Sequence, residues 1–477
     1  MRYKTGELVR DQYTLIPFSF DELISEDNIV RVIDAYVDKL DMKELNFKYI
    51  ETSTTGNRAY NPKQMLKLYL YGYYNGIRSS RKLKKETERN IEVMWFMGKM
   101  QPCFKTIADF RKNNIDNMKK VFGAFSRLCD ELGLIGKEIE AIDGSKFRAS
   151  NSRRRNLTKG KLQKQIEYYE KQADEYMKVL DAEDKLEENY NDKVKGSKEE
   201  IKEKIEKAKK RIEELKEEKA DVEENGEKSL TDPDARHMMA SNNGTDIAHN
   251  VQIAVDGKHD LVTAVDVTSS PADQGQLYPI AKKLKNILGI KKITVLADKG
   301  YWSGEDLRRC ARNRIKAIVA VPESKDTEYG KDKFKYDKEK NVYICPEGKE
   351  LYCTGKKDLK YLNAKACKEC TARDRCTKSK KGRNIRRGKN EEHLERGTRR
   401  YKRNRTLYKR RQEIVEHVFG TVKRAFGYTY FLLRGNRKVK GESFMFFLTY
   451  NIKRVSNILG NKELLDYIMA KDSIKLT

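Results

Sequence analysis

Apolar residues in the first part of the chain recur at steps of three and four, which is the spacing of one buried helix face. One such stripe includes Met65 and Leu68 and begins directly after Asn61-Pro62, a capping residue followed by a first-turn proline. Similar stripes continue to about residue 132. The pattern predicts an all-helical N-terminal domain over residues 1–135.

Beyond residue 136 the apolar positions form short continuous runs, which suit strands covered on both faces. The predicted strands lie at 138–143, 249–256, 261–266, 293–298 and 315–321, with helices at 277–288 and 305–313. Three antiparallel strands, a helix, a parallel strand, a helix and a last strand follow the order of a ribonuclease-H-like fold. An apolar helix over 443–459 would close this mixed five-stranded α/β core.

Two long helical patterns interrupt the predicted sheet. Apolar residues step by three and four from Leu162 to Leu180 and again from Ile201 to Leu215, with Glu and Lys at most other positions. This is typical of an antiparallel coiled-coil hairpin inserted in the domain. A spacer, a dimer contact and a DNA clamp are all compatible with it.

A second insertion is rich in cysteine and in basic residues. Its sulfur ligands would be Cys345, Cys367, Cys370 and Cys376, and the pair two residues apart suits one tetrahedral zinc ion. Unmetallated thiols and an iron–sulfur cluster are the alternatives. Residues 378–411 then carry 16 Lys and Arg against three Glu, a density that suits a segment following a phosphate backbone.

The net charge of +28 narrows the class of partner. Such an excess exceeds what solubility needs and points to a polyanion, either nucleic acid or an anionic membrane surface. The chain has no run of 18 or more apolar residues, and its start lacks the hydrophobic region of a signal peptide. We therefore expect a cytoplasmic protein that binds nucleic acid and no membrane.

Three acidic residues stand where a metal site could form. Asp143 and Asp298 each end a predicted strand, and Glu416 lies on a predicted helix over 413–423. Two strand-end aspartates and a helix-borne glutamate provide the oxygen ligands that a two-metal phosphodiester site needs. For Asp143-Gly144 alone, an ordinary turn is the competing interpretation.

Several stretches in order give the chain a specific resemblance. They are 60–73 (YNPKQMLKLYLYGY), 76–83 (GIRSSRKL), 141–149 (AIDGSKFRA), 231–236 (TDPDAR), 297–302 (ADKGYW), 415–423 (VEHVFGTVK) and 450–454 (YNIKR). Together they resemble the DDE transposases of bacterial insertion sequences, in the group with a transposase InsH-like N-terminal domain. The likeness covers almost the whole chain.

The resemblance implies roles for particular residues. Asp143, Asp298 and Glu416 would be the catalytic residues and would hold two Mg²⁺ or Mn²⁺ ions. Lys423, seven positions after Glu416, matches a DNA-contacting lysine of the family. The family's Arg and Tyr positions hold Gln412 and Lys409 here, so Arg411 and Tyr408, one position away from each, are the expected substitutes.

Further DNA contacts are expected at two other places. Lys146 and Arg148 leave the Asp143 strand as cations beside an acidic site, where a DNA backbone could enter. Arg78 and Arg81 begin the second of two short helices about a Gly turn, which resembles a helix-turn-helix. An ordinary helical hairpin and a solvated loop are the competing interpretations.

The expected activity is transposition. The protein would bind the double-stranded ends of its insertion sequence, assemble as a homodimer on DNA, and cleave and join strands by in-line chemistry. A non-catalytic, repressor-like or domesticated DNA-binding protein and a structure-selective nuclease are the alternatives. The expected divisions are 1–135 (helical, DNA-binding), 136–158 with 229–325 and 406–460 (catalytic), 159–228 (coiled coil), 326–405 (Cys-rich) and 461–477 (tail).

Overall fold

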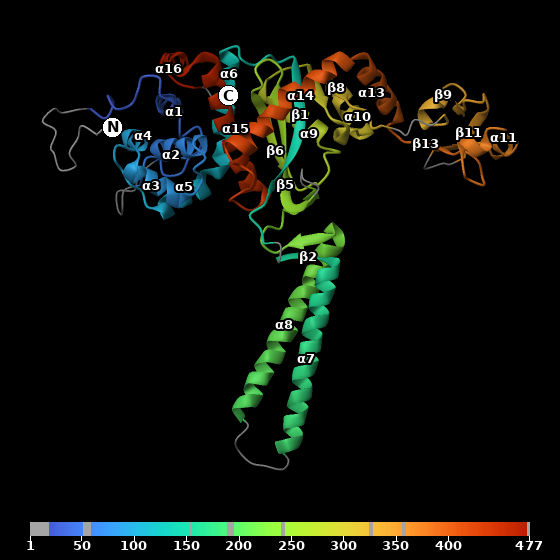
Figure 1. Cartoon of the computed structure of the whole chain (residues 1–477), viewed down its shortest axis with the longest axis horizontal. Coiled ribbons are helices and arrows are strands. Elements are labelled where there is room, and N and C mark those ends of the chain that lie inside the picture. Colours follow the sequence, from blue (N-terminus) through green and yellow to red (C-terminus); the bar gives the residue numbers. More distant parts are fainter. Residues whose placement is uncertain are drawn as a thin grey trace, which may run out of the picture.

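The computed structural model describes residues 19–50, 59–152, 155–187, 195–239, 244–323, 328–354 and 359–474. Figure 1 shows a row of three parts, with the N-terminal helices at one end, a mixed sheet in the middle and a small Cys-rich sheet at the other end. A long helical hairpin projects from the middle part. Among the described helices, none is both long enough and apolar enough to cross a membrane.

The described residues of the N-terminal part are helical, as predicted. The elements are α1 (Ile29–Asp38), α2 (Pro62–Tyr74), α3 (Ser80–Arg89), α4 (Ile91–Met97), α5 (Phe104–Asn114), the 3₁₀ turn η1 (Ile115–Asn117) and α6 (Met118–Glu131). The Asn61 side chain accepts a hydrogen bond from Lys63 N, and Pro62 occupies the first turn of α2. The sequence signal for this helix start is therefore confirmed.

The middle part is built on a six-stranded mixed sheet. Its strands are β1 (Ile139–Arg148), β4 (Arg236–Met239), β5 (Thr245–Asp256), β6 (Val262–Thr268), β7 (Ile293–Ala297) and β8 (Ile315–Val319). The order is β4-β5-β1-β7-β8, and β6 pairs with β5 next to β4. All five predicted strands are present, and the short β4 after the predicted turn at 231–236 is the addition.

One expectation about β1 is wrong. Its parallel pairing with β7 ends at Ile142 and Ala297, but its antiparallel pairing with β5 continues to Arg148. The strand continues because β5 is 12 residues long and still offers backbone partners on that side. Asp143 therefore lies within a strand, with its side chain 22% exposed, and not at an exposed strand end.

Helices cover both faces of this sheet. They are α9 (Leu277–Ile287), α10 (Gly304–Arg312), α13 (Glu391–Arg403), α14 (Arg405–Gly420) with the π-helical turn η5 (Thr421–Ala425), and α15 (Asn436–Leu459). The apolar residues Ile414, Val415 and Val418 of α14 are buried, as its stripe predicts. This helix lies against β1 and brings its polar residues to the edge of the Asp143 strand.

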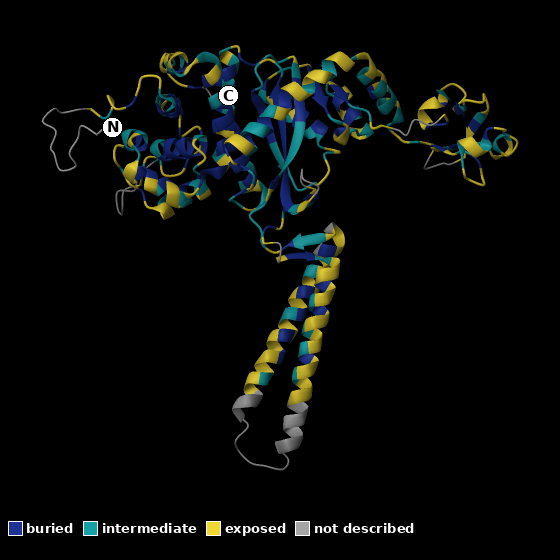
Figure 2. Ribbon diagram, viewed as in Figure 1, coloured by how far each residue is buried: buried dark blue, intermediate teal, exposed yellow. Residues whose placement is uncertain are grey.

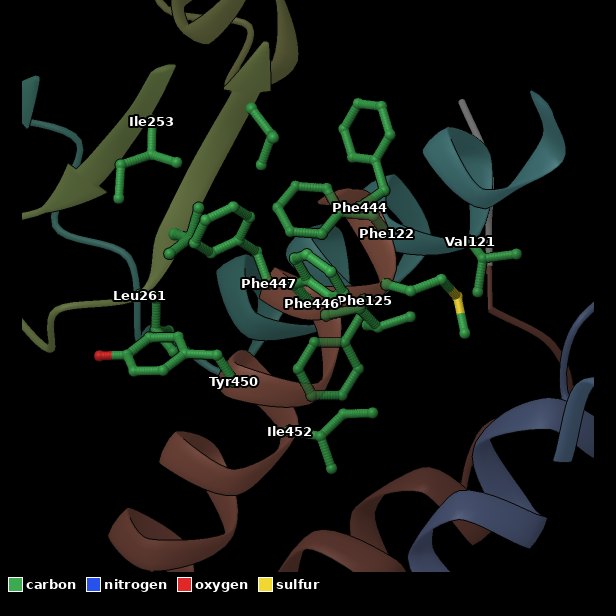
Figure 3. Packing of buried hydrophobic residues seen from close by; sticks show 14 of the residues in the cluster. Val121, Phe122, Phe125, Ile253, Leu261, Phe444, Phe446, Phe447, Tyr450 and Ile452 are labelled. Carbon is green, nitrogen blue, oxygen red and sulfur yellow. The ribbon is translucent and has the colours of Figure 1, made fainter. Parts of the chain in front are cut away.

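The long helix α15 joins the N-terminal helices to the sheet in one core. On one side, the ring of Phe444 lies 5.4 Å from that of Phe122 of α6. On the other side, the Asn451 amide donates to Val262 O and its oxygen accepts from Val262 N, both at 2.8 Å. Figure 3 shows these packed rings between the two parts. The two predicted domains thus share one continuous set of buried residues.

The expected C-terminal tail contains a folded helix. Residues Asn461–Met469 form α16, which packs on α1 and buries Leu464 and Ile468. Farther on, Ile474 is also buried, and its backbone N–H donates to Lys39 O at 3.0 Å. Packing on α1 provides apolar contacts that an isolated short helix would lack.

The hairpin insertion contains two long helices that pack against each other. Its helices are α7 (Lys159–Glu187) and α8 (Lys195–Asn225), and the short strands β2 (Asn156–Thr158) and β3 (Glu227–Ser229) pair at its base. Leu162, Ile166, Leu215 and Val222 form the buried seam. Figure 2 shows that the outer faces of both helices are largely exposed.

The Cys-rich insertion is shorter than expected. It forms an antiparallel sheet of β13 (Ile385–Arg387), β12 (Leu359–Leu362), β11 (Glu350–Cys353), β10 (Val342–Ile344) and β9 (Lys335–Asp337), with short helices α11 (Ala364–Lys368) and α12 (Arg373–Cys376). The following helix α13 belongs to the sheet domain, because Arg400 Nη1 donates to Ala317 O at 3.0 Å and Gly397 contacts Trp302. The insertion therefore ends near residue 387 and not at 405.

Candidate active site

Asp143 and Asp298 lie side by side. Ile142 pairs with Ala297 in parallel register, so the next residue on each strand is one of the two aspartates. Adjacent strands are about 4.8 Å apart, which puts the two carboxylates within reach of common ligands. Asp298 Oδ1 accepts a hydrogen bond of 2.8 Å from Gly300 N and caps the turn η3 (Lys299–Tyr301). The register of β1 and β7 thus places the two aspartates on adjacent strands.

The environment of Asp143 opposes its negative charge. Burial raises the pKa of Asp143 to about 6, and the charges of Asp298 and Asp273 add to this rise. The guanidinium of Arg411 and the Gly144 N–H, which donates to Oδ1 at 2.9 Å, act in the opposite direction. A buried carboxylate among like charges is a frequent feature of functional sites.

Arg411 faces this carboxylate from α14. Its Nη1 lies 3.5 Å from Asp143 Oδ2, and the Tyr408 ring lies one helical turn away on the same side. The buried Arg411 atoms Nε and Nη1 have no hydrogen-bond partner among the described residues. Two unsatisfied N–H groups beside the aspartates could donate to an anion such as a phosphate. Tyr408 and Arg411 are thus placed at the site despite their shift along the sequence.

Among the described residues, Glu416 does not form a ready metal site with the two aspartates. It lies on α14 with an exposed side chain. Its carboxylate makes no hydrogen bond or ion pair with the part of the chain that the structure describes. The structure thus brings together Asp143 and Asp298, and it does not join Glu416 to them.

Lys423 lies at the site, although not as a freely projecting side chain. Its Nζ donates to Ser145 Oγ at 2.6 Å and to Lys146 O at 2.8 Å, and it lies 4.6 Å from the centre of the Phe147 ring. Burial lowers the pKa of Lys423 to about 8, and the charge of Lys146 adds to this. Ser145 is on the same face of β1 as Asp143, since alternate strand residues share a face.

The two arginines near the start of α3 that were expected to contact DNA differ in their exposure to solvent. Arg78 is 7% exposed, and its Nη1 donates to Tyr430 O at 2.6 Å and pairs with Glu442 at 3.3 Å. The expectation that Arg78 contacts DNA is therefore wrong, because its guanidinium is engaged inside the protein. Arg81 is exposed and lies over the ring of Phe104.

The strand residues after Asp143 also differ from each other. Lys146 forms an ion pair with Asp273, at 3.0 Å between Nζ and Oδ1. Arg148 is exposed at the end of β1 and lines a pocket of about 450 Å³ together with Tyr430. Sequence reasoning missed Asp273, whose only signal is its position in a Ser-Pro-Gly loop between β6 and α9.

Four of the five cysteines of the insertion, all except Cys353, lie close together. Burial raises the pKa of Cys376, and the neighbouring thiols Cys367, Cys345 and Cys370 contribute to the rise. The Lys349 N–H donates to Cys345 Sγ at 3.3 Å. No disulfide links any cysteine of the described residues. The spacing that predicted a common site therefore does gather the four thiols in one place.

The side chains at both places are of the chemical types that bind metal ions, but they are not spaced to bind one in this structure. Carboxylates are the ligands of Mg²⁺ and Mn²⁺, and four thiols are the ligands of structural zinc. Within the described ranges, however, no three His, Cys, Asp or Glu side chains are arranged as a ready metal site. The carboxylates and the thiols are therefore ligands that the expected ions would accept. In each group, the side chains would have to move closer together to coordinate an ion.

Comparison with known families gives two matches. The family described as "Transposase domain (DUF772)" matches residues 18–113, and the one described as "Transposase DDE domain" matches residues 344–456. The second match contains Arg411, Glu416 and Lys423, whereas Asp143 and Asp298 lie between the two matched segments. Searches of curated proteins and of solved structures gave no match.

Proposed function

Because the chain belongs to the DDE transposases of insertion sequences, we propose that it binds the ends of its element and catalyses metal-dependent strand cleavage and transfer. The observation that carries this proposal is the pairing of Asp143 with Asp298, with Arg411 and Lys423 beside them. The mixed sheet has the strand order of a ribonuclease-H-like domain, which supports the same chemistry.

Each residue of the candidate site would have its own role in binding the metal ions or the phosphate. Asp143 and Asp298, completed by Glu416 when α14 adjusts, would hold two Mg²⁺ or Mn²⁺ ions. Bound there, the ions would supply Lewis-acid stabilisation of the attacking and leaving oxygens. Arg411 would donate its two unsatisfied N–H groups to the phosphate, and Lys423 would neutralise charge next to Ser145.

Double-stranded DNA is the proposed partner of the exposed cations. Arg148 and Arg81 are exposed and available to phosphates, and so are many cations of the 378–411 segment. Arg78 has no such role, because it is buried. The +28 net charge would make end binding strongly dependent on salt.

The hairpin differs from the rest of the chain in its charge. Residues 159–225 carry 17 Lys and Arg against 21 Asp and Glu, whereas the whole chain carries 101 against 73. A segment with an acidic balance is a poor DNA clamp, since it would repel phosphates. We therefore favour a coiled-coil arm that contacts a second copy of the chain when a homodimer assembles on DNA.

A cleavage assay on DNA that carries the element's ends tests the proposal. Asp143→Asn, Asp298→Asn and Glu416→Gln should each abolish Mg²⁺-dependent cleavage, because each removes a metal-binding charge. End binding, measured by mobility shift, should remain close to that of the unmodified protein. The matched control is Asp34→Asn, which removes a carboxylate of α1 that pairs with Lys67 at 2.5 Å in the N-terminal helices. Cleavage that persists in any of the three site variants would contradict the assignment of that residue.

One observation favours the non-catalytic alternative. Glu416 is exposed and, among the described residues, is not arranged with the two aspartates as a ready metal site, as expected for a DNA-binding relic that keeps the scaffold. Such a protein would bind element ends and leave them intact at every Mg²⁺ and Mn²⁺ concentration. A nuclease would instead cut the ends and give no joined products.

A further inference from the structure

A polar network lies directly behind the two aspartates, and Asp273 is its centre. Asp273 Oδ1 accepts hydrogen bonds from Lys146 Nζ at 3.0 Å, Asn250 Nδ2 at 2.7 Å and Gln252 Nε2 at 2.8 Å. Asn250 and Gln252 are buried in β5. Three donors on one oxygen leave Asp273 little freedom to move or to rotate.

The network explains why a glycine follows Asp143. Gly144 pairs with Gln252 across β1 and β5. A Cβ atom at Gly144 would clash with Gln252 Nε2 and lie 2.8 Å from Asp273 Oδ1. Asp143-Gly144 is therefore not a turn, and the glycine provides the space through which Gln252 reaches Asp273.

The same network reaches Asp298. Gln252 Oε1 accepts a hydrogen bond from the Tyr301 hydroxyl, and Tyr301 is fully buried at the end of the turn that Asp298 caps. A Cβ atom at Gly300 would lie 3.0 Å from Asp298 Oδ1 and 3.7 Å from Asp273 Oδ2. Asp273 is therefore close to both aspartates and is tied to the backbone that positions one of them.

The charge of Asp273 has a specific partner. Lys146 is the one cation that pairs with it among the described residues, through both carboxylate oxygens at 3.0 and 3.2 Å. The Lys146 side chain is 18% exposed, so this pair is weakly screened. Without Asp273, the ammonium would be attracted to Asp298, since the carboxylates of Asp298 and Asp273 both lie close to Gly300.

We propose that Asp273 is a positioning residue that holds the Lys146 ammonium away from Asp298, and so leaves the pair of aspartates open to metal ions. The proposal rests on the proposed function, because it concerns access to the same two aspartates. Asp273 acts through Lys146 and is not itself assigned to a metal.

Terbium luminescence tests this without measuring cleavage. The chain has two tryptophans, and Trp302 lies four positions after Asp298, so a Trp95→Phe parent leaves one sensitiser next to the site. Tb³⁺ is a hard cation that occupies oxygen sites of this kind. In the parent, excitation of Trp302 should sensitise bound Tb³⁺, and Asp298→Asn should remove the signal.

The test variants separate charge from structure. Asp273→Asn should raise the apparent Kd for Tb³⁺ by about tenfold or more, as loss of an outer-shell partner does. Adding Lys146→Met to Asp273→Asn should return the Kd to within about threefold of the parent, because the released ammonium is then absent. Lys146→Met alone should keep the parent Kd within the same range, and so should the control Asp34→Asn, whose carboxylate pairs with Lys67 in the N-terminal helices.

Two results would overturn the inference. One is an unchanged Kd in Asp273→Asn, and the other is a weakened Kd that Lys146→Met does not restore, as a purely structural role would give. If Asp273→Asn does not fold by circular dichroism, Asp273→Ser takes its place with the same expected Kd values. A parent signal that Asp298→Asn leaves intact would instead refute the metal site of the proposed function.

Discussion

Asp143 should make the metal-free protein less stable near neutral pH. Its pKa is raised from 3.8 to about 6, so the folded state prefers the protonated acid. The contribution of this group to stability is therefore fully present below pH 3.8 and is lost as the pH rises through about 6. Asp143→Asn, which resembles the protonated acid, should remove that loss and stabilise the fold.

The size of the stabilisation expected for Asp143→Asn follows from the pKa of Asp143 and from the exposure of its side chain. About two pKa units at 1.36 kcal/mol each correspond to roughly 3 kcal/mol at pH values above 6. The attraction of Arg411 is already part of this net shift. Since the side chain is 22% exposed, solvent screening lowers the expected gain to about 2 kcal/mol.

Urea unfolding with EDTA, followed by Trp302 fluorescence in a Trp95→Phe parent, measures the effect. Asp143→Asn should be more stable than the parent by about 2 kcal/mol near pH 8, and the two proteins should converge near pH 4. Added Mg²⁺ should stabilise the parent more than the variant, because only the parent keeps the carboxylate.

Asp266→Asn is the matched control of opposite sign. Burial would raise the pKa of Asp266, but hydrogen bonds from Lys283 and Lys440 outweigh it and hold the pKa below its ordinary value. Its replacement should therefore destabilise the protein near neutral pH. Refutation would come from an Asp143→Asn protein that is less stable than the parent near pH 8, or whose difference from the parent does not shrink toward pH 4.

Three further predictions concern other parts of the chain. Lys423→Ala should slow cleavage and lower the salt slope of end binding by about one counterion, while leaving metal affinity nearly unchanged; unaltered rates and slope would remove Lys423 from the site. Elemental analysis should find about one zinc per chain, and serine in place of Cys367 and Cys370 should abolish it, whereas freshly reduced protein without tightly bound metal would contradict a zinc site. Replacing residues 159–225 by a short Gly-Ser linker should keep circular dichroism and the thermal midpoint of the remainder while weakening dimer assembly on DNA, because the arm packs on itself; loss of the fold would make the arm part of the core.

Local patterns were sufficient for most elements. The helix start at Asn61-Pro62 could be predicted from the sequence because a capping residue and a first-turn proline act within one helical turn. The apolar contact between the two hairpin helices could be predicted from the sequence because its residues repeat at helical spacing and pack against one another. The tail was misjudged, since α16 depends on burial of Leu464 and Ile468 against the distant α1.

For the site, the sequence by itself determined which chemical groups are present, and the tertiary structure decided which of them meet. Two apolar runs ending in aspartate predicted two strands, and the register of β1 and β7 places Asp143 beside Asp298. Nothing in the neighbouring sequence distinguishes Arg78 from Arg81, yet Arg78 is buried, where it pairs with Glu442 of α15. Asp273 gave no sequence signal beyond its place in a loop, because its partners Lys146, Asn250 and Gln252 come from two strands that only the folded sheet brings together. Periodicity and capping depend on neighbours a few residues away, whereas ion pairs and shared hydrogen bonds depend on distance in space, which long-range strand pairing sets.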